Sequence, residues 1–208
     1  MLVKEGIKMP AMKDQVASRE RIARHGEVLT GQREVNAMLD LVKHETERID
    51  STFLEPACGT GNFLAEILAR KLRVVKQMYG KSQWEYERYG VLAVSSLYGI
   101  DILEDNVSEC RKRLFTFFDA EYTSLYKAKT KLECRKAVRF ILDRNIIHGN
   151  ALTLKTEGEQ PEPIVFSRWK LVGGRKIKRH DYAFHDLTPP ESEEALPLFE
   201  EQCGVFTR

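Results

Sequence analysis

Short apolar runs alternate along the chain with longer stretches in which apolar residues recur at helical spacing. Phe53-Leu54 is the first such run, and the stretch after it repeats apolar residues at helical spacing from Phe63 to Val75. This alternation predicts strands joined by helices, which is the arrangement of an α/β fold. The predicted strands are 53–54, 91–101, 145–148 and 164–166. The predicted helices are 21–50, 62–79 and 105–142.

Polar or irregular segments flank these elements and divide the chain. Residues 1–19 are aperiodic, so we expect an arm there. The aromatic-rich stretch 81–90 is interpreted as an insertion that packs over the preceding helix. After the last strand, 168–184 is predicted to form a β-hairpin that turns at Gly173-Gly174. We therefore divide the chain into an N-terminal arm and helix (1–50), a core (51–166), and a basic hairpin with an acidic tail (167–208).

The stretch 52–63, T-F-L-E-P-A-C-G-T-G-N-F, combines a strand, a glycine turn and the start of a helix. Gly59 and Gly61 allow a tight bend and the close approach of a ligand. The helix that begins near Asn62 directs unpaired N–H groups and the positive end of its dipole toward that ligand, so an anionic group is expected. A dinucleotide-binding loop has a third glycine where this chain has Leu64, and the Gly-Lys-Ser/Thr sequence of a P-loop is missing.

Composition narrows the possible partners. The chain carries 33 basic and 31 acidic side chains and a net charge of +2, so nucleic-acid binding would need a local basic patch. Its four cysteines, Cys58, Cys110, Cys134 and Cys203, are too widely spaced for a Cys-x-x-Cys metal site, so we expect reduced thiols and no metal. No apolar run reaches the ~18 residues that suggest a membrane span, and no signal peptide is recognisable. These features predict a cytoplasmic protein without a membrane partner.

The nonapeptide E-P-A-C-G-T-G-N-F at 55–63 resembles the S-adenosylmethionine loop of amino-group DNA methyltransferases, above all the adenine-N6 enzymes of restriction-modification systems. The resemblance implies a Rossmann-like methyltransferase fold with a doubly wound, mainly parallel sheet, and S-adenosylmethionine as cofactor. It also implies that most of this loop binds the cofactor. The implied residues are Glu55, Pro56, Ala57, Cys58, Gly59, Gly61, Asn62 and Phe63.

Three further segments resemble cofactor-binding motifs of the same family. Upstream, the segment 24–31 is similar to a G-E-V-F-T-P-like motif, which implies that Thr30 contacts the methionine end of the cofactor. The G-I-D-I sequence implies that Asp101 and Ile102 hold the ribose, although an aspartate at a strand end can equally cap the next helix. The third segment is similar to a G-N-A-L motif in which the Asn carbonyl oxygen accepts a hydrogen bond from the adenine amine. Its residues are Asn150, Ala151 and Leu152.

The resemblance ends where the catalytic tetrapeptide, Asn or Asp followed by Pro-Pro-Tyr, would follow the fourth strand. This chain has Ser167-Arg168-Trp169-Lys170 there, without prolines, so the catalytic residues remain unknown. The Pro-Pro pair at 188–191, T-P-P-E, lies too far downstream and is interpreted as a linker turn. Few residues follow, so the sequence predicts a member of the family that is truncated after the fourth strand or degenerate.

A basic cluster marks the predicted hairpin and is the part of the chain best suited to contact phosphates. Its residues are Arg168, Lys170, Arg175, Lys176, Lys178, Arg179 and His180. The alternative is a solvated hairpin whose lysines protect a sheet edge.

Three functions remain open from the sequence. The first is a subunit of an adenine-N6 DNA methylase, with a partner methyltransferase chain, a specificity subunit or a second copy supplying the missing parts. The second is a catalytically silent S-adenosylmethionine-binding sensor or regulator of a mobile element. The third is methyl transfer to a small molecule or a protein.

Overall fold

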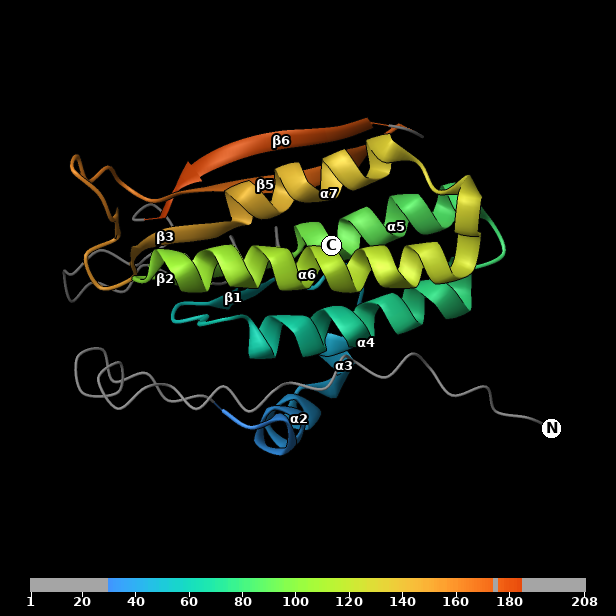
Figure 1. Cartoon of the computed structure of the whole chain (residues 1–208), viewed down its shortest axis with the longest axis horizontal. Coiled ribbons are helices and arrows are strands. Elements are labelled where there is room, and N and C mark those ends of the chain that lie inside the picture. The colour runs from blue at the N-terminus through green and yellow to red at the C-terminus, as the bar shows by residue number, and fades with distance from the viewer. Residues whose placement is uncertain (1–29, 174–175, 185–208) are drawn as a thin grey trace, which may run out of the picture.

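A computed structural model describes residues 30–173 and 176–184, and the predicted arm, the acidic tail and the Thr188–Glu191 turn lie outside this part. The described chain alternates helices with short strands, as the apolar pattern predicts (Figure 1). Its helices are α2 (Gln32–Leu41), α3 (Lys43–Thr46), α4 (Asn62–Tyr79), α5 (Gln83–Ser95), α6 (Glu104–Tyr126), the 3₁₀ turn η1 (Lys127–Lys129) and α7 (Leu132–Asn145). Its strands are β1 (Phe53–Glu55), β2 (Leu97–Asp101), β3 (Ile146–Asn150), β4 (Lys155–Thr156), β5 (Val165–Val172) and β6 (Lys176–Ala183).

The central sheet has four strands in the order β1-β2-β3-β4. The first three are parallel, with Glu55 opposite Gly99 and Asp101 opposite His148, and β4 is antiparallel to β3. Parallel neighbours need long crossover connections, and here each crossover is a pair of antiparallel helices. The fold is therefore α/β with a mixed, mostly parallel sheet.

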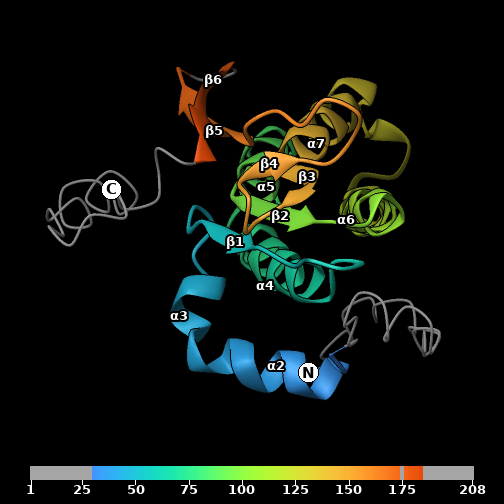
Figure 2. The same cartoon turned by 90° about the vertical axis from the view of Figure 1, so that its left-hand side faces the viewer.

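The two helix pairs that connect the parallel strands pack against each other and against the sheet. Helices α4 and α6 begin at the carboxyl ends of β1 and β2 and lie on the same side of the sheet (Figure 2). Helices α5 and α7 run back and end directly before β2 and β3. Their apolar faces form one continuous core in which Leu68, Val94, Leu114 and Val138 are buried. The carboxyl ends of the parallel strands consequently lie together at one end of the molecule.

The other face of β2 contributes to a smaller core. Tyr98 and Ile100 are buried there against Ile164 and Phe166, and no residue of helices α2 to α7 belongs to this described cluster. The Tyr98 hydroxyl donates a 2.9 Å hydrogen bond to the carbonyl of Ser167. The segment that leads into β5 thus covers this face of the sheet.

Two of the predicted elements have different boundaries. Residues 91–95, expected to begin a strand, are the last residues of α5, and the expected insertion 81–90 forms most of that helix. Ser82 caps the helix by accepting a hydrogen bond from the Glu85 N–H, and a Ser followed three residues later by Glu is a helix-start signal. A buried apolar run alone does not separate strand from helix. The expected helix 105–142 is likewise broken, at Lys127, where φ is +50°.

The predicted fourth strand does not join the central sheet. Strand β5 pairs with β6 alone in an antiparallel hairpin, and β4 takes the place next to β3. Strand β5 also runs opposite to β3, because Ile164 lies against Gly149 near the end of β3 and Trp169 bonds to Asn145 just before its start. The predicted hairpin is confirmed, but its register leaves three residues between Val172 and Lys176 instead of two.

The N-terminal helix is shorter than expected within the described residues. Helix α2 begins after Gly31, which is its N-cap, so Thr30 does not have the capping role that the sequence allowed. Of the predicted apolar face, Val35 and Leu39 are buried, whereas Met38 and Val42 are exposed. No helix in the described ranges combines the length and apolar character that crossing a bilayer requires.

Candidate functional site

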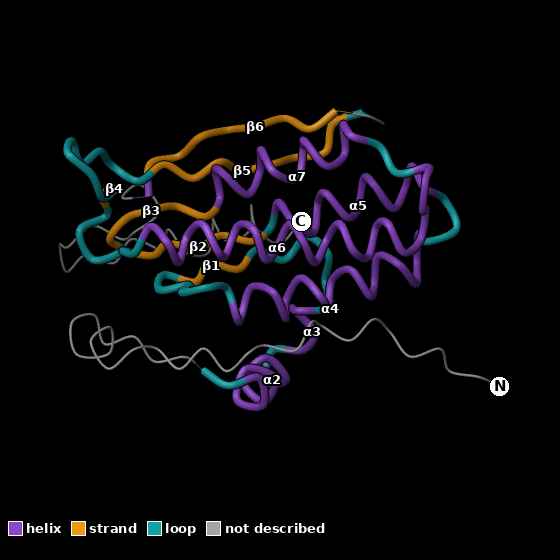
Figure 3. Tube along the Cα trace, viewed as in Figure 1, coloured by secondary structure: helices purple, strands orange, loops and turns teal. Residues whose placement is uncertain are grey.

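The loops that follow β1, β2 and β3 gather at one end of the molecule (Figure 3, left). The first loop carries Gly59, the second follows Asp101, and the third follows Asn150. Hydrogen bonds join the first two strand ends: the Gly59 N–H donates to Asp101 Oδ2 at 2.7 Å. His148 Nε2 lies 3.0 Å from the Ile102 carbonyl and links the second end to the third. Three of the predicted motifs therefore lie at one edge, where ligands bind in open α/β sheets.

The two loop glycines have different structural roles. Both have positive φ, +52° at Gly59 and +84° at Gly61. A Cβ on Gly61 would lie 2.6 Å from the Sγ of Cys110 on α6, so internal packing requires glycine there. A Cβ on Gly59 would meet no atom within 4 Å. Gly59 is therefore the glycine at which a ligand can approach the backbone closely.

Cys58 fixes the base of the glycine loop. Its N–H donates to the Ile100 carbonyl at 2.9 Å, and its side chain packs where a Cβ on Gly99 would be. The adjacent Cys110 thiol and burial raise the pKa of the Cys58 thiol. The thiol is consequently neutral and serves packing, because nucleophilic attack needs the thiolate.

Asp101 is buried at the end of β2, and both of its carboxylate oxygens accept hydrogen bonds. Its Oδ1 accepts hydrogen bonds from the Leu103 N–H at 2.9 Å and from Asn106 Nδ2 at 3.1 Å, while Oδ2 accepts from Gly59. The alternative that this carboxylate supports the entry into the next helix is thus realised, through Leu103, the residue before α6. A carboxylate has about four acceptor positions, so Oδ2 keeps one for a hydroxyl of a ligand.

Asn62 and Arg113 hold the other side of the glycine loop. Asn62 Nδ2 donates to the Thr30 carbonyl at 3.1 Å, which places Thr30 beside the loop. Arg113 on α6 donates from Nη1 to Asn62 Oδ1 at 2.5 Å and to the Thr60 carbonyl at 3.4 Å. Burial lowers the pKa of this guanidinium. Arg113 was not expected from the sequence, because nothing in a helical repeat distinguishes it from the neighbouring basic residues.

The third strand end differs from the expectation for adenine recognition. Asn150 Oδ1, expected to accept from a bound amine, instead accepts from the N–H groups of Leu152 at 2.9 Å and Thr153 at 3.3 Å. These bonds form an Asx turn, which is a local alternative that Asn readily adopts. Leu152 is 94% exposed, and Ala151 packs on the smaller core.

The remaining predicted loop residues frame the opening. Glu55 is partly buried at the end of β1, and this burial raises the pKa of its carboxyl group. Pro56 and Ala57 are exposed, and Ile102 is also exposed at the end of β2. Phe63 packs against the main core. The edge thus combines an open glycine, a half-buried carboxylate and exposed apolar surface.

The segment in the position of the catalytic tetrapeptide lies away from this edge. Trp169 donates from Nε1 to Asn145 Oδ1 at 2.8 Å and makes an edge contact with Phe140, with ring centroids 6.0 Å apart. Both partners belong to α7, which precedes β3. Ser167 donates to Asp181 at 2.7 Å within the hairpin. None of these side chains is placed to orient a substrate at the carboxyl ends of the strands.

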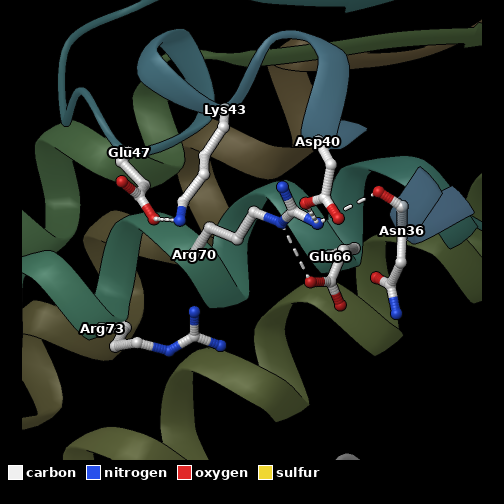
Figure 4. A pocket seen from close by; sticks show the side chains of 7 residues that line it. All are labelled: Asn36, Asp40, Lys43, Glu47, Glu66, Arg70 and Arg73. Carbon is white, nitrogen blue, oxygen red and sulfur yellow. Dashed lines mark hydrogen bonds and ion pairs between the residues drawn. The ribbon is translucent and has the colours of Figure 1, made fainter. Parts of the chain in front are cut away.

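A cavity of about 270 Å³ lies elsewhere, between α2–α3 and the outer side of α4 (Figure 4). Its charged groups are largely neutralised by each other, since Arg70 pairs with Asp40 at 2.8 Å and with Glu66 at 3.1 Å. The residues that line it are Asn36, Asp40, Lys43, Glu47, Glu66, Arg70 and Arg73. The glycine loop does not contribute, so we assign the candidate site to the strand ends on chemical grounds.

The described residues contain no group of three or more His, Cys, Asp and Glu side chains that would hold a metal ion. No family model matches the chain, and searches of curated proteins and of solved structures found no match. The function must therefore be argued from the site itself.

Proposed function

We propose that the chain binds S-adenosylmethionine at the carboxyl ends of β1, β2 and β3, as the cofactor-binding part of a methyltransferase-like protein that acts on adenine in DNA. One observation carries the proposal: Gly59 faces open space with positive φ and is hydrogen-bonded to the carboxylate of Asp101. A glycine with a free approach, beside a carboxylate at the next strand end, suits a nucleoside ligand.

The residues at this edge fit such a cofactor. The 18-residue helix α4 begins next to the opening and offers the positive end of its dipole to a carboxylate. Glu55 offers a carboxylate to the cationic part of the ligand, and Asp101 Oδ2 has an acceptor position for a ribose hydroxyl. The bound cofactor would supply a transferable methyl group on its sulfonium centre. These residues would bind and orient it, with Arg113 and Asn62 fixing the loop.

Two versions of the function differ in whether any group positions the target amino group, and on which chain that group lies. Because β5 runs away from the candidate site, Ser167 and Trp169 do not lie where a target amino group would have to be held. A methylase would therefore take these groups from a partner methyltransferase or specificity chain, or from a second copy. The same observation favours a second candidate, a protein that binds the cofactor and performs no methyl transfer.

The test of cofactor binding is isothermal titration of the full chain with S-adenosylmethionine. Gly59→Ala places a methyl group in the open approach and should weaken binding about tenfold or more, which corresponds to ~1.4 kcal/mol. Gly173→Ala is the matched control, since Gly173 also has positive φ and no atom within 4 Å of its Cβ position. Absence of binding by the unmodified chain, or equal losses in both variants, would contradict the proposal.

The two versions are separated by methyl transfer. Duplex DNA is incubated with the chain and radiolabelled cofactor, alone and together with methyltransferase or specificity chains encoded nearby. Label in the DNA supports the methylase version. Tight cofactor binding without label under every combination supports the silent version.

A further inference from the structure

The hairpin β5–β6 presents a basic face to solvent. Side chains alternate across a strand, and the odd-numbered residues Trp169 and Ile177 pack against the main core. Beyond Phe166, which is buried in the smaller core, the even-numbered positions from Lys170 to Val172 and from Lys176 to His180 therefore face outward. We call the set Lys170, Lys176, Lys178 and His180, all exposed, the hairpin basic face.

This face has like charges in direct opposition. Lys170 pairs with Lys178 across the two strands. Side chains that are directly opposite have Cβ atoms about 4.5–5.5 Å apart, and like charges in such a pair destabilise the hairpin. No Asp or Glu stands at an even-numbered described position of either strand. An ion pair between Arg179 and Asp181 at 3.1 Å lies at odd-numbered positions.

We propose that the hairpin basic face docks on the phosphate backbone of duplex DNA. A row of lysines on a two-stranded ribbon is complementary in charge to a phosphate backbone, and a ribbon of this kind has the width that the major groove admits. Three of the four basic side chains lie within residues 176–180 of β6, which extend over about 16 Å, so the face reaches several phosphates. The choice of DNA among polyanions rests on the proposed function, whereas the basic face itself follows from strand register and exposure.

The position of the face defines its role. The hairpin runs from the carboxyl edge of the sheet back toward the start of β3, so its basic face lies along the flank of the molecule. Strand β6 is the outer strand, as Figures 1 and 2 both show. DNA bound here is held and aligned beside the cofactor site, and the target base must be presented by another element.

The test measures binding of a fluorescein-labelled 20-base-pair duplex to the full chain by anisotropy, across a series of salt concentrations. The double variant Lys170→Gln/Lys178→Gln should weaken binding about tenfold or more and reduce the slope of log K against log salt by about 1.8, which is ~0.9 for each phosphate contact. The control Lys43→Gln/Lys112→Gln removes the same charge from exposed lysines on α3 and α6 and should leave both quantities unchanged.

Other outcomes overturn the proposal. Equal losses of DNA affinity in both double variants would assign binding to the overall charge of the chain. Absence of DNA binding by the unmodified chain at 50 mM salt would contradict the proposal directly. Binding to phosphatidylserine vesicles without binding to DNA would assign the face to a membrane. The melting temperature of the double variant checks that it is folded. It should rise, because the substitutions remove the repulsion between the directly opposed Lys170 and Lys178. The same variants are also titrated with S-adenosylmethionine. Their affinity for the cofactor should equal that of the unmodified chain, so failure of DNA binding can be told apart from failure of cofactor binding.

Discussion

The Gly59 N–H donates a 2.7 Å hydrogen bond to Oδ2 of Asp101, 42 residues later, and so joins the loop after β1 to the end of β2. The other carboxylate oxygen holds Leu103 and Asn106. One side chain therefore fixes both the glycine loop and the entry into α6. A loop that is already held in place loses less conformational freedom when a ligand binds, which favours affinity.

Asp101→Asn should therefore reduce both the free energy of unfolding and the binding of the proposed cofactor. The substitution keeps the shape but removes the charge, and an amide nitrogen turned toward an N–H donor cannot accept its hydrogen bond. We expect the free energy of unfolding to fall by about 1–3 kcal/mol, the range for hydrogen bonds to charged groups and for unsatisfied buried donors. Urea denaturation measures the first effect, and titration with S-adenosylmethionine measures the second.

Asp143→Asn provides the control for this change. Asp143 is exposed on α7, so the same loss of charge should alter the free energy of unfolding by less than about 0.5 kcal/mol. If Asp101→Asn unfolds at the same urea concentration as the control, the carboxylate does not organise the loop.

Gly61→Ala should be destabilising through a specific neighbour. The added Cβ would lie 2.6 Å from Cys110 Sγ at a φ of +84°, so both steric overlap and backbone strain oppose it. We expect a loss of about 1–3 kcal/mol. In a double-mutant cycle, Cys110→Ala should restore the steric part, giving a coupling energy of about 0.5–3 kcal/mol. Strictly additive losses would mean that the clash with Cys110 is not the cause.

The sequence predicted where the residues of the candidate site lie better than it predicted their hydrogen-bond partners. Parallel strands end at one edge of a sheet, so the order of the motifs was enough to bring Gly59, Asp101 and Asn150 to that edge. The partners of each side chain depend on loop conformation. The Asx turn at Asn150 depends on the local loop conformation, and the hydrogen bond from Arg113 to Asn62 joins residues 51 positions apart. A motif encodes neither of them.

The predicted start of the second strand and the predicted sheet of the fourth strand were wrong for a physical reason. Segment 91–95 contains the buried apolar residues Val91, Ala93 and Val94, and segment 164–166 contains Ile164 and Phe166. Burial alone does not decide whether a segment is helical or which sheet it joins. The cap at Ser82 was a readable signal for α5. The direction of β5 depends on Tyr98 and Trp169, whose partners lie far away in the sequence.

Asn145 should be far more important to stability than Asn150. It is fully buried, and its Nδ2 donates to the carbonyls of Ser95 at 3.1 Å and Leu97 at 2.9 Å. Asn145→Ala removes the side-chain donor from both buried carbonyls, for a loss of about 2–5 kcal/mol. Asn150→Ala disrupts an exposed turn and should cost less than ~1 kcal/mol. Chemical denaturation of the two variants checks the order, and equal losses would contradict it.

Trp169→Phe tests how the hairpin is attached. The ring remains, but the 2.8 Å bond to Asn145 Oδ1 is lost, which should cost about 1–2 kcal/mol. Amide hydrogen exchange should accelerate in β5 and β6, while β1 to β3 keep their protection. A uniform acceleration across all strands would show that the bond supports the whole fold instead of the hairpin.

Lys71 is fully buried at the start of the sheet and has a complete set of acceptors. Its Nζ donates to the carbonyl of Ile49 at 3.2 Å, to Ser96 Oγ at 2.6 Å and to the carbonyl of Ser51. Burial lowers the pKa of this amine to about 7, and the nearby charges of Glu45, Asp50 and Arg48 have smaller and partly opposing effects. The protonation state of one core side chain therefore changes close to neutral pH.

This shift predicts a pH dependence of stability that Lys71→Met removes. In the unfolded chain the lysine pKa is about 10.4, so between pH 7 and that value the unfolded state binds more protons than the folded state. The free energy of unfolding should consequently rise from pH 7 to 8.5, by at most about 1.4 kcal/mol per pH unit, and flatten below pH 7. The Cys110 thiol and burial raise the pKa of the Cys58 thiol, and burial raises that of Cys134. Both thiols therefore ionise more readily in the unfolded chain, which opposes the rise as the pH approaches the ordinary thiol pKa of about 8.5. Urea denaturation at each pH measures this rise in the free energy of unfolding. The rise should appear in the unmodified chain and in Lys112→Met, the control at an exposed lysine. If it persists in Lys71→Met, another group causes it.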